Sequence, residues 1–180
     1  MTVVNRKEFA YKKHIIFLVL TISLIISVFS CRLSVSLTGS NINPNAKTVS
    51  IATFTNNASL VNPSLSQEFT TALINKIQSQ TPLTIVNVNG DYTLEGEITG
   101  YSISPVAIQG NDVAAMNRLT ITVRVRFSSR YDENSDFEQS FSRYMDYNSA
   151  DNFSTRESGL VSAINEALTD DVFNKSFVNW

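Results

Sequence analysis

Hydrophobic and polar residues alternate strictly over residues 118–127. The odd positions are apolar: Leu119, Ile121, Val123, Val125 and Phe127. The even positions are polar or charged: Arg118, Thr120, Thr122, Arg124 and Arg126. This alternation predicts a strand with one buried face and one wet face. It resumes over 137–147 after the polar turn 132–136, so we expect a hairpin between the two strands.

A different spacing marks the first predicted helix. Apolar residues recur every four positions at Leu65, Phe69, Leu73 and Ile77, which gives one hydrophobic stripe along a helix. We expect Asn62 to cap this helix, Pro63 to take its first position, and Ser64 and Gln67 to form an overlapping capping box. Pro82 stops it.

The second predicted helix closes the chain. A capping box over Ser154–Glu157 starts it, and its buried side is lined by Leu160, Val161, Ile164, Leu168 and Val172. The stripe continues through Phe173, Phe177 and Trp180. Such a stripe is typical of core packing, and the alternative is that the terminal tryptophan docks on a partner.

The remaining segments predict further strands. Short strands are expected at 33–37, 49–54 and 83–86, and a longer one begins at Tyr92, after the turn Asn89-Gly90-Asp91, and is limited or bent at Pro105. In this longer strand we place the even positions on one face, and Glu95, Glu97 and Tyr101 on the other. The order predicts an α+β two-layer sandwich, with a mixed, mostly antiparallel sheet and both helices on one face.

The N-terminus has the order of a bacterial lipoprotein signal. A basic start is followed by an apolar run over 15–29, then Ser30 and Cys31, the only cysteine. We expect residues 1–30 to be removed and Cys31 to carry acyl chains that anchor a single domain, 31–180, to a membrane. Phe29 is bulkier than usual before such a cysteine. An uncut membrane anchor is one alternative, although the run is shorter than the roughly 20 residues that span a bilayer. A buried free cysteine is another.

The composition of the domain 31–180 excludes several kinds of binding and catalytic site. Without residues 1–30 the chain has 10 basic and 15 acidic residues, because four of the 14 Lys and Arg and one of the 16 Asp and Glu are lost with the signal. A charge of −5 gives no bulk attraction to nucleic acid. The sole histidine, His14, is also lost, which excludes histidine-based nucleophile systems and His/Cys zinc sites. Carboxylates, Lys, Tyr and Ser remain as possible catalytic groups, and we expect no cofactor and no metal.

Four arginines share one parity and form what we call the arginine strip: Arg118, Arg124, Arg126 and Arg130. The guanidinium fork suits phosphate, which it binds through paired hydrogen bonds. One interpretation is that the strip contacts a phosphorylated ligand or acidic residues of a partner. The other is that these arginines pair with Glu95, Glu97 or Glu138 on neighbouring strands.

Three other features have competing interpretations. Glu95 and Glu97 lie about 7 Å apart on a strand, a spacing that a glycosidase could use, but arginine pairing explains them more simply. The acids at 132–136 and 170–171 lack calcium-loop spacing and are expected to be solvated. The segment 105–117 is either an exposed apolar hairpin tip or a loop folded back on the domain.

Several segments of the chain resemble sequences of the lipopolysaccharide-assembly lipoprotein family LptE. They are 49–54, Leu60-Val61-Asn62-Pro63 leading into 65–67, 96–101, 117–120, 173–175 and the closing Trp180. The resemblance covers essentially all of 31–180. It implies a small sheet with two helices on one face and no catalysis.

The resemblance also implies partners and a location. An LptE-like protein would sit in the outer membrane, lipid-anchored and facing the periplasm, as a plug and assembly factor for the LptD β-barrel, and would bind lipopolysaccharide and aid its transport to the outer leaflet. In that case the phosphorylated ligand of the arginine strip would be lipopolysaccharide. The alternative is another periplasm-facing lipoprotein, of the pilotin or cell-wall-synthase-activator type.

Overall fold

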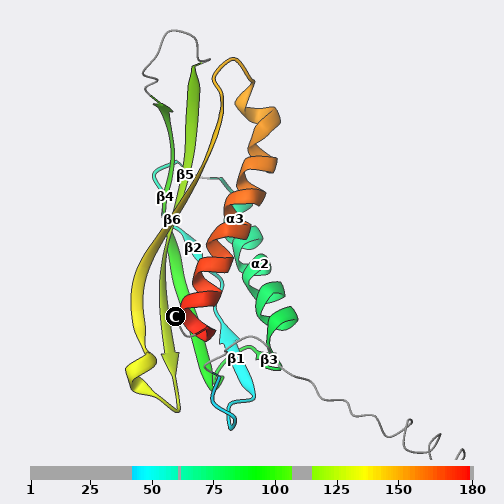
Figure 1. The fold of residues 1–180 in the computed structure, drawn as a ribbon, viewed down its shortest axis with the longest axis vertical. Helices are drawn as coiled ribbons and strands as arrows, with labels where there is room; N and C mark the ends of the chain where they lie inside the picture. Colours follow the sequence, from blue (N-terminus) through cyan, green and yellow to red (C-terminus); the bar gives the residue numbers. More distant parts are fainter. Residues whose placement is uncertain (1–41, 61, 107–114, 179–180) are drawn as a thin grey trace, which may run out of the picture. The chain divides into compact units, whose positions relative to one another are not determined.

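The computed structural model describes residues 42–60, 62–106 and 115–178. Two helices lie side by side on one face of a six-stranded sheet (Figure 1), which confirms the predicted α+β architecture. The elements in chain order are β1 (Thr48–Ile51), β2 (Thr55–Asn56), α2 (Leu65–Gln80), β3 (Thr84–Val86), β4 (Tyr92–Val106), β5 (Met116–Ser129), the short 3-10 helix η1 (Glu133–Ser135), β6 (Phe137–Asn148) and α3 (Phe153–Phe177).

Some expectations lie outside the described residues. They are the signal segment 1–30, the lipidated Cys31, the short strand at 33–37, most of the loop 105–117, and Trp180. These stay predictions.

The sheet combines two kinds of pairing. Its strand order is β3-β1-β4-β5-β6, with β2 also paired to β4. β4, β5 and β6 form an antiparallel meander, and the expected hairpin of β5 with β6 is confirmed. β1 is parallel to both β3 and β4. Parallel neighbours need a crossover, and α2 provides it between β1 and β3.

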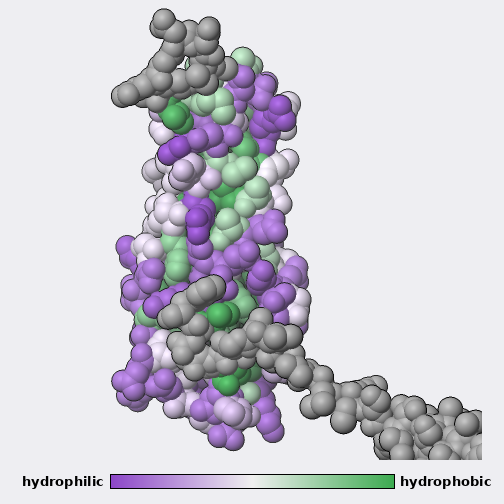
Figure 2. All heavy atoms as spheres, viewed as in Figure 1, coloured by the Kyte–Doolittle hydropathy of each residue, from purple (hydrophilic) through white to green (hydrophobic). Residues whose placement is uncertain are grey.

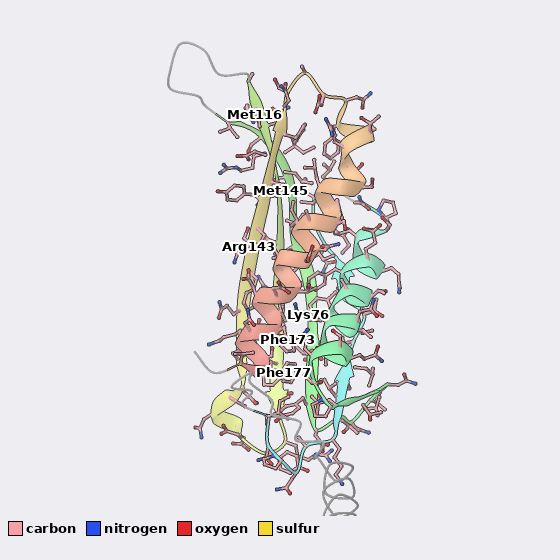
Figure 3. All side chains as sticks on the ribbon, turned by 45° about the vertical axis from the view of Figure 1, so that its right-hand side comes forward. Lys76, Met116, Arg143, Met145, Phe173 and Phe177 are labelled. Carbon is pink, nitrogen blue, oxygen red and sulfur yellow. The ribbon has the colours of Figure 1, made fainter. Side chains whose placement is uncertain are left out.

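The core lies between the sheet and the two helices. The odd positions of β5 from Leu119 to Phe127 are at most 1% exposed. The four stripe residues of α2 are fully buried, and Val161, Ile164, Leu168 and Val172 of α3 face the same core. Phe173 and Phe177, seen on the last turns of α3 in Figure 3, are buried too. The core interpretation of these two aromatic residues is therefore confirmed.

A bulge in β4 corrects one prediction. The register of β4 against β5 shifts between Ile98 and Gly100. One extra residue moves every following side chain to the opposite face. Tyr101 was expected on the wet face beside Glu97, but it is 3% exposed and faces the helices.

The helix starts also differ from the sequence prediction. α2 begins at Leu65, not at Pro63, because Asn62 and Pro63 belong to a preceding turn. Asn62 still caps it, since its Oδ1 accepts the backbone N–H groups of Ser64 and Leu65. Ser64, the residue at the N-cap position, makes no side-chain capping bond.

At the start of α3 the expected box is wrong. Asn152 is the N-cap, and its Oδ1 accepts the Ser154 N–H at 3.0 Å. Glu157 is therefore free to bond elsewhere. An asparagine side chain accepts the same backbone N–H groups as a serine side chain, so the local sequence is compatible with a cap at either Asn152 or Ser154.

The surface of the described part is mainly polar. Purple and white residues dominate the face drawn in Figure 2, with smaller green areas between them. The exposed large hydrophobic residues are scattered over several elements: Leu60, Val88, Ile103, Tyr131, Tyr144 and Met145. Among the described residues, no helix has the length and apolar character needed to cross a bilayer.

Candidate functional site

The candidate site is the sheet face turned away from the helices, which we call the outer sheet face. Arg118, Arg124 and Arg126 alternate on β5 with the buried odd positions, so they project from this face. Arg130 follows the end of the strand. The structure therefore brings the arginine strip together as a row, with side chains that are 33%, 50%, 66% and 60% exposed in chain order.

The central arginines are paired across the sheet. Arg124 lies opposite Glu97 of β4, with its Nη1 3.1 Å from the Glu97 Oε1. Arg126 lies opposite Glu95, with a corresponding distance of 3.4 Å. These two ion pairs confirm the expected pairing with β4. They also account for both glutamates without any glycosidase chemistry.

Arg118 has the most specific environment of the four. Its Nε and Nη2 donate to the two oxygens of Asp146 on β6, at 2.7 and 2.9 Å. Its guanidinium carbon lies 3.6 Å from the centre of the Tyr144 ring, a cation–π distance. The hydrogen bond from Arg118 lowers the pKa of Asp146, and the same bond raises the pKa of Arg118. The pair is therefore fully charged at neutral pH.

Arg130 lies near Asp91, whose carboxylate also binds the backbone at the start of β1. Asp91 Oδ2 accepts the backbone N–H groups of Lys47 and Thr48 and the Thr48 hydroxyl, at 2.8–3.0 Å. The Lys47 N–H and the Thr48 hydroxyl are the main reasons why the pKa of Asp91 is lowered. Arg130 Nη1 lies 3.5 Å from the other oxygen. The turn signal alone could not predict this role of Asp91, because its partners Lys47 and Thr48 lie more than 40 residues earlier in the chain.

Shallow hollows lie beside these pairs. One of about 330 Å³ is bordered by Gly96, Glu138, Arg124 and Arg126. Another of about 520 Å³ lies toward Asp91 and Arg130 at the end of the strip. The two hollows share Ala52 and Glu95 in their walls. Their open, polar form suits surface recognition of a large polar ligand better than enclosure of a small one.

The charges of the strip are balanced. Each of the four arginines has one carboxylate partner, so the row has little excess positive potential. An anion would have to share or displace those carboxylates. In the described part of the chain no three acidic, histidine or cysteine side chains form a metal-binding group. Asp170 and Asp171, considered above for cation binding, pair instead with Lys76 and Arg143.

A second polar cluster lies on the helix side of the sheet. The Tyr101 hydroxyl donates to Glu157 Oε1 at 2.6 Å, and Asn62 Nδ2 donates to the same oxygen at 2.8 Å. This cluster joins β4, the turn before α2 and the first turns of α3. Sequence analysis missed it because it depends on the bulge in β4 and on the true start of α3.

Several solved structures are similar to this chain. A minor lipoprotein from Acinetobacter baumannii has 15% identity and a TM-score of 0.50, covering 72% of this chain and 91% of that one. A hypothetical protein from Chlamydia trachomatis has 11% identity and a TM-score of 0.54, covering 72% and 95%. Rare lipoprotein B from Shewanella oneidensis has 14% identity and a TM-score of 0.49, covering 71% and 92%. At these identities the first two matches concern the fold alone.

Curated protein sequences gave no match to the chain. A family model, by contrast, matches residues 46–176, which is well over half of the sequence, and it is described as LptE, lipopolysaccharide-assembly. The matched range runs from just before β1 into the last turn of α3, so it includes every strand described above. This chain therefore belongs to the lipopolysaccharide-assembly family LptE.

Proposed function

We propose that the protein is an outer-membrane lipoprotein that partners an LptD-type β-barrel and aids the transport and insertion of lipopolysaccharide into the outer leaflet. The observation that carries this proposal is the family match over 46–176. The role is that of a plug and assembly factor, without catalysis. In support, Glu95 and Glu97, whose spacing a glycosidase could use, are each paired with an arginine.

The anchor in this proposal is Cys31. Acylation there would hold the domain at the periplasmic side of the membrane, because several acyl chains together bind a bilayer firmly. The expected products are a mature chain that begins at Cys31 and a mass increase from the acyl groups. Mass spectrometry of the purified protein measures both, and a Cys31→Ser variant should stay unprocessed and unacylated.

The contact with lipopolysaccharide is assigned to the arginine strip. Lipid A and the inner core carry phosphates and carboxylates, which suit the planar guanidinium. Arg124 and Arg126 are the most accessible members on β5, half or more exposed. A phosphate that binds here replaces Glu95 or Glu97 as the partner of one arginine, so we expect affinity to depend on salt and on these glutamates.

Arg124→Glu tests this assignment in a lipopolysaccharide-binding titration. Arg156→Glu is the matched control, because Arg156 is also an exposed arginine paired with one carboxylate, but it lies on α3. Loss of a charge-assisted bond should weaken binding about tenfold in Arg124→Glu, with little change in the control. Equal affinity of the two variants would contradict a role of the strip.

A further inference from the structure

One long strand at the end of the sheet has a neighbour on only one side. β6 stands last in the strand order and, among the described strands, pairs only with β5. It is 12 residues long, whereas β3, the strand at the opposite end, has only 3. A short edge strand offers few backbone groups for pairing, but β6 offers a long row of them.

The hydrogen bonds at one end of β6 show which of its residues face the free side. The Ser149 N–H donates to the carbonyl oxygen of Ala115, directly opposite in the register of β5 and β6. Bonded and non-bonded pairs alternate along an antiparallel ladder. The odd residues of β6 therefore bond β5, and the even residues from Glu138 to Asp146 direct their N–H and C=O groups outward. No group of the described residues bonds these outward groups.

This edge is accessible and lacks most of the usual protection. All residues from 138 to 146 are exposed except Phe141. Natural edge strands often carry lysine, proline or a bulge, which prevent pairing with another chain. β6 contains neither lysine nor proline, and its register with β5 runs without a shift.

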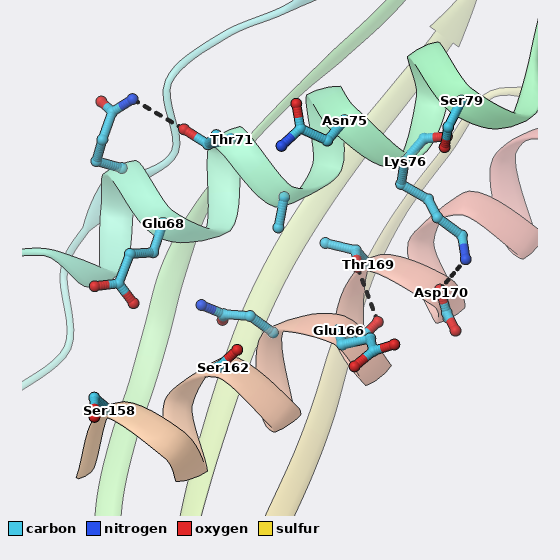
Figure 4. A pocket seen from close by; sticks show the side chains of 13 residues that line it. Glu68, Thr71, Asn75, Lys76, Ser79, Ser158, Ser162, Glu166, Thr169 and Asp170 are labelled. Atoms are coloured by element: carbon cyan, nitrogen blue, oxygen red, sulfur yellow. Dashed lines mark hydrogen bonds and ion pairs between the residues drawn. The ribbon is translucent and has the colours of Figure 1, made fainter.

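The helix layer neutralises the one charge that points inward from the middle of β6. α3 is joined to α2 by the Lys76–Asp170 ion pair (Figure 4) and to β6 by the pair of Arg143 with Asp171. An inward-pointing charge guards many edge strands, but Arg143 already has its partner. Met145, on the same face of the strand and labelled with Arg143 in Figure 3, is 40% exposed. An apolar side chain beside the edge can therefore pack against Met145.

We propose that β6 binds an extended segment of a partner protein, which adds to the sheet as an antiparallel strand. The backbone of the segment bonds the outward N–H and C=O groups from Glu138 to Asp146, a stretch that about nine residues and 30 Å of extended chain match. Its side chains are apolar beside Met145 and basic beside Glu138, which forms no ion pair within the described part of the chain. The site is the edge of the sheet, and it does not depend on the proposed function.

A second copy of the chain fits this edge less well. Two antiparallel β6 strands related by a two-fold axis join residues of the same parity, so that the buried faces stay on one side. The two longest overlaps of this kind are centred on Ser142 and on Arg143. The first sets Glu138 opposite Asp146 of the other copy, and the second sets Arg143 opposite itself. Like charges directly opposite each other destabilise a sheet, so a different protein is the better occupant.

The test is a calorimetric titration of the full chain in detergent with an acetylated, amidated peptide of about nine alternating threonine and valine residues that ends in lysine. We expect saturable binding. Ser140→Pro removes an outward N–H but no bond to β5, and proline is tolerated at such an edge position. It should weaken binding about tenfold or more. Ser140→Thr keeps the N–H group and should bind within about twofold of wild type.

A second pair of variants tests the edge without proline. Met145→Lys introduces the charge that natural edge strands use against pairing and should weaken binding about fivefold or more. Val88→Lys is the matched control, because Val88 is 70% exposed and lies between β3 and β4, away from the peptide site. Circular dichroism verifies that each variant is folded.

Three results would overturn the proposal. They are no binding of the peptide to wild type, equal affinity of folded Ser140→Pro and Ser140→Thr, and equal affinity of the two lysine variants. Analytical ultracentrifugation without peptide tests the other occupant. A dimer of the wild type that Ser140→Pro abolishes would assign the edge to a second copy and would overturn the choice of a different protein.

Discussion

Replacing Tyr101 with phenylalanine removes one hydroxyl from the junction of β4, α2 and α3. The ring is 3% exposed and stays buried in Tyr101→Phe, so the change isolates the bond to Glu157. A hydrogen bond to a charged group contributes about 1.5–3 kcal/mol. Glu157 is only half-buried and keeps its bond from Asn62. Water can partly replace the hydroxyl, so we expect a loss near the lower end, about 1.5 kcal/mol.

Urea denaturation followed by far-UV circular dichroism measures this loss, and the midpoint of thermal unfolding should fall by about 3–6 °C. Tyr144→Phe is the control, because Tyr144 is 53% exposed and its ring still lies under Arg118. That variant should change stability by less than about 0.5 kcal/mol. Equal stability of the two variants would refute the view that the Tyr101–Glu157 bond stabilises the junction of β4, α2 and α3.

The remaining predictions concern two glycines, a carboxylate and an ion pair. A Cβ at Gly96 would lie 2.1 Å from the Arg124 carbonyl oxygen, so Gly96→Ala should lower the free energy of unfolding by about 1–3 kcal/mol. Gly159→Ala in α3 meets nothing within 4 Å and should raise it by about 0.5–1 kcal/mol in the same urea titration. Asp91→Asn should destabilise the fold at pH 7. Folding lowers the pKa of Asp91 from its ordinary value of 3.8, so the ionised carboxylate stabilises the fold above pH 3.8 and progressively less below it. The difference in free energy of unfolding between wild type and Asp91→Asn should therefore shrink as the pH falls below 3.8. A difference that is constant between pH 7 and pH 3 would contradict this. Glu97→Gln frees Arg124 and should strengthen lipopolysaccharide binding up to about fivefold, and weaker binding in that titration would count against competition between the glutamate and a phosphate.

The sequence predicted those parts of the fold that depend on local periodicity. The alternation over 118–127 and the four-residue spacing of α2 predicted the correct buried residues, because each pattern lies within a single strand or helix. The antiparallel hairpin of β5 and β6 followed from the polar turn between them. The parallel pairing of β1 with β3 and β4 is a long-range arrangement that no local pattern in these short strands encodes.

The errors arose where one residue changes the phase of a pattern. The bulge between Ile98 and Gly100 reversed the faces of the rest of β4, and so placed Tyr101 in the core. The start of α2 was placed two residues too early, and the cap of α3 was assigned to Ser154 instead of Asn152, because Asn, Ser and Pro are all favoured near a helix start.

The candidate site was predicted in part. The parity of β5 placed its arginines on one face, and the pairing with Glu95 and Glu97 was among the stated alternatives. The partners of Arg118 and Arg130 were not foreseen, because Asp146 and Asp91 reach them only through the register of β6 and the fold of the β4 start.

The central claim is that this protein works with an outer-membrane β-barrel of the LptD type. The most direct test is to purify the tagged, lipidated chain from detergent-solubilised outer membranes and to identify co-purifying proteins by mass spectrometry. The proposal predicts one large β-barrel of that type in stoichiometric amount. An intact, lipidated chain that carries instead a secretin or a cell-wall synthase, and no such barrel, would contradict it.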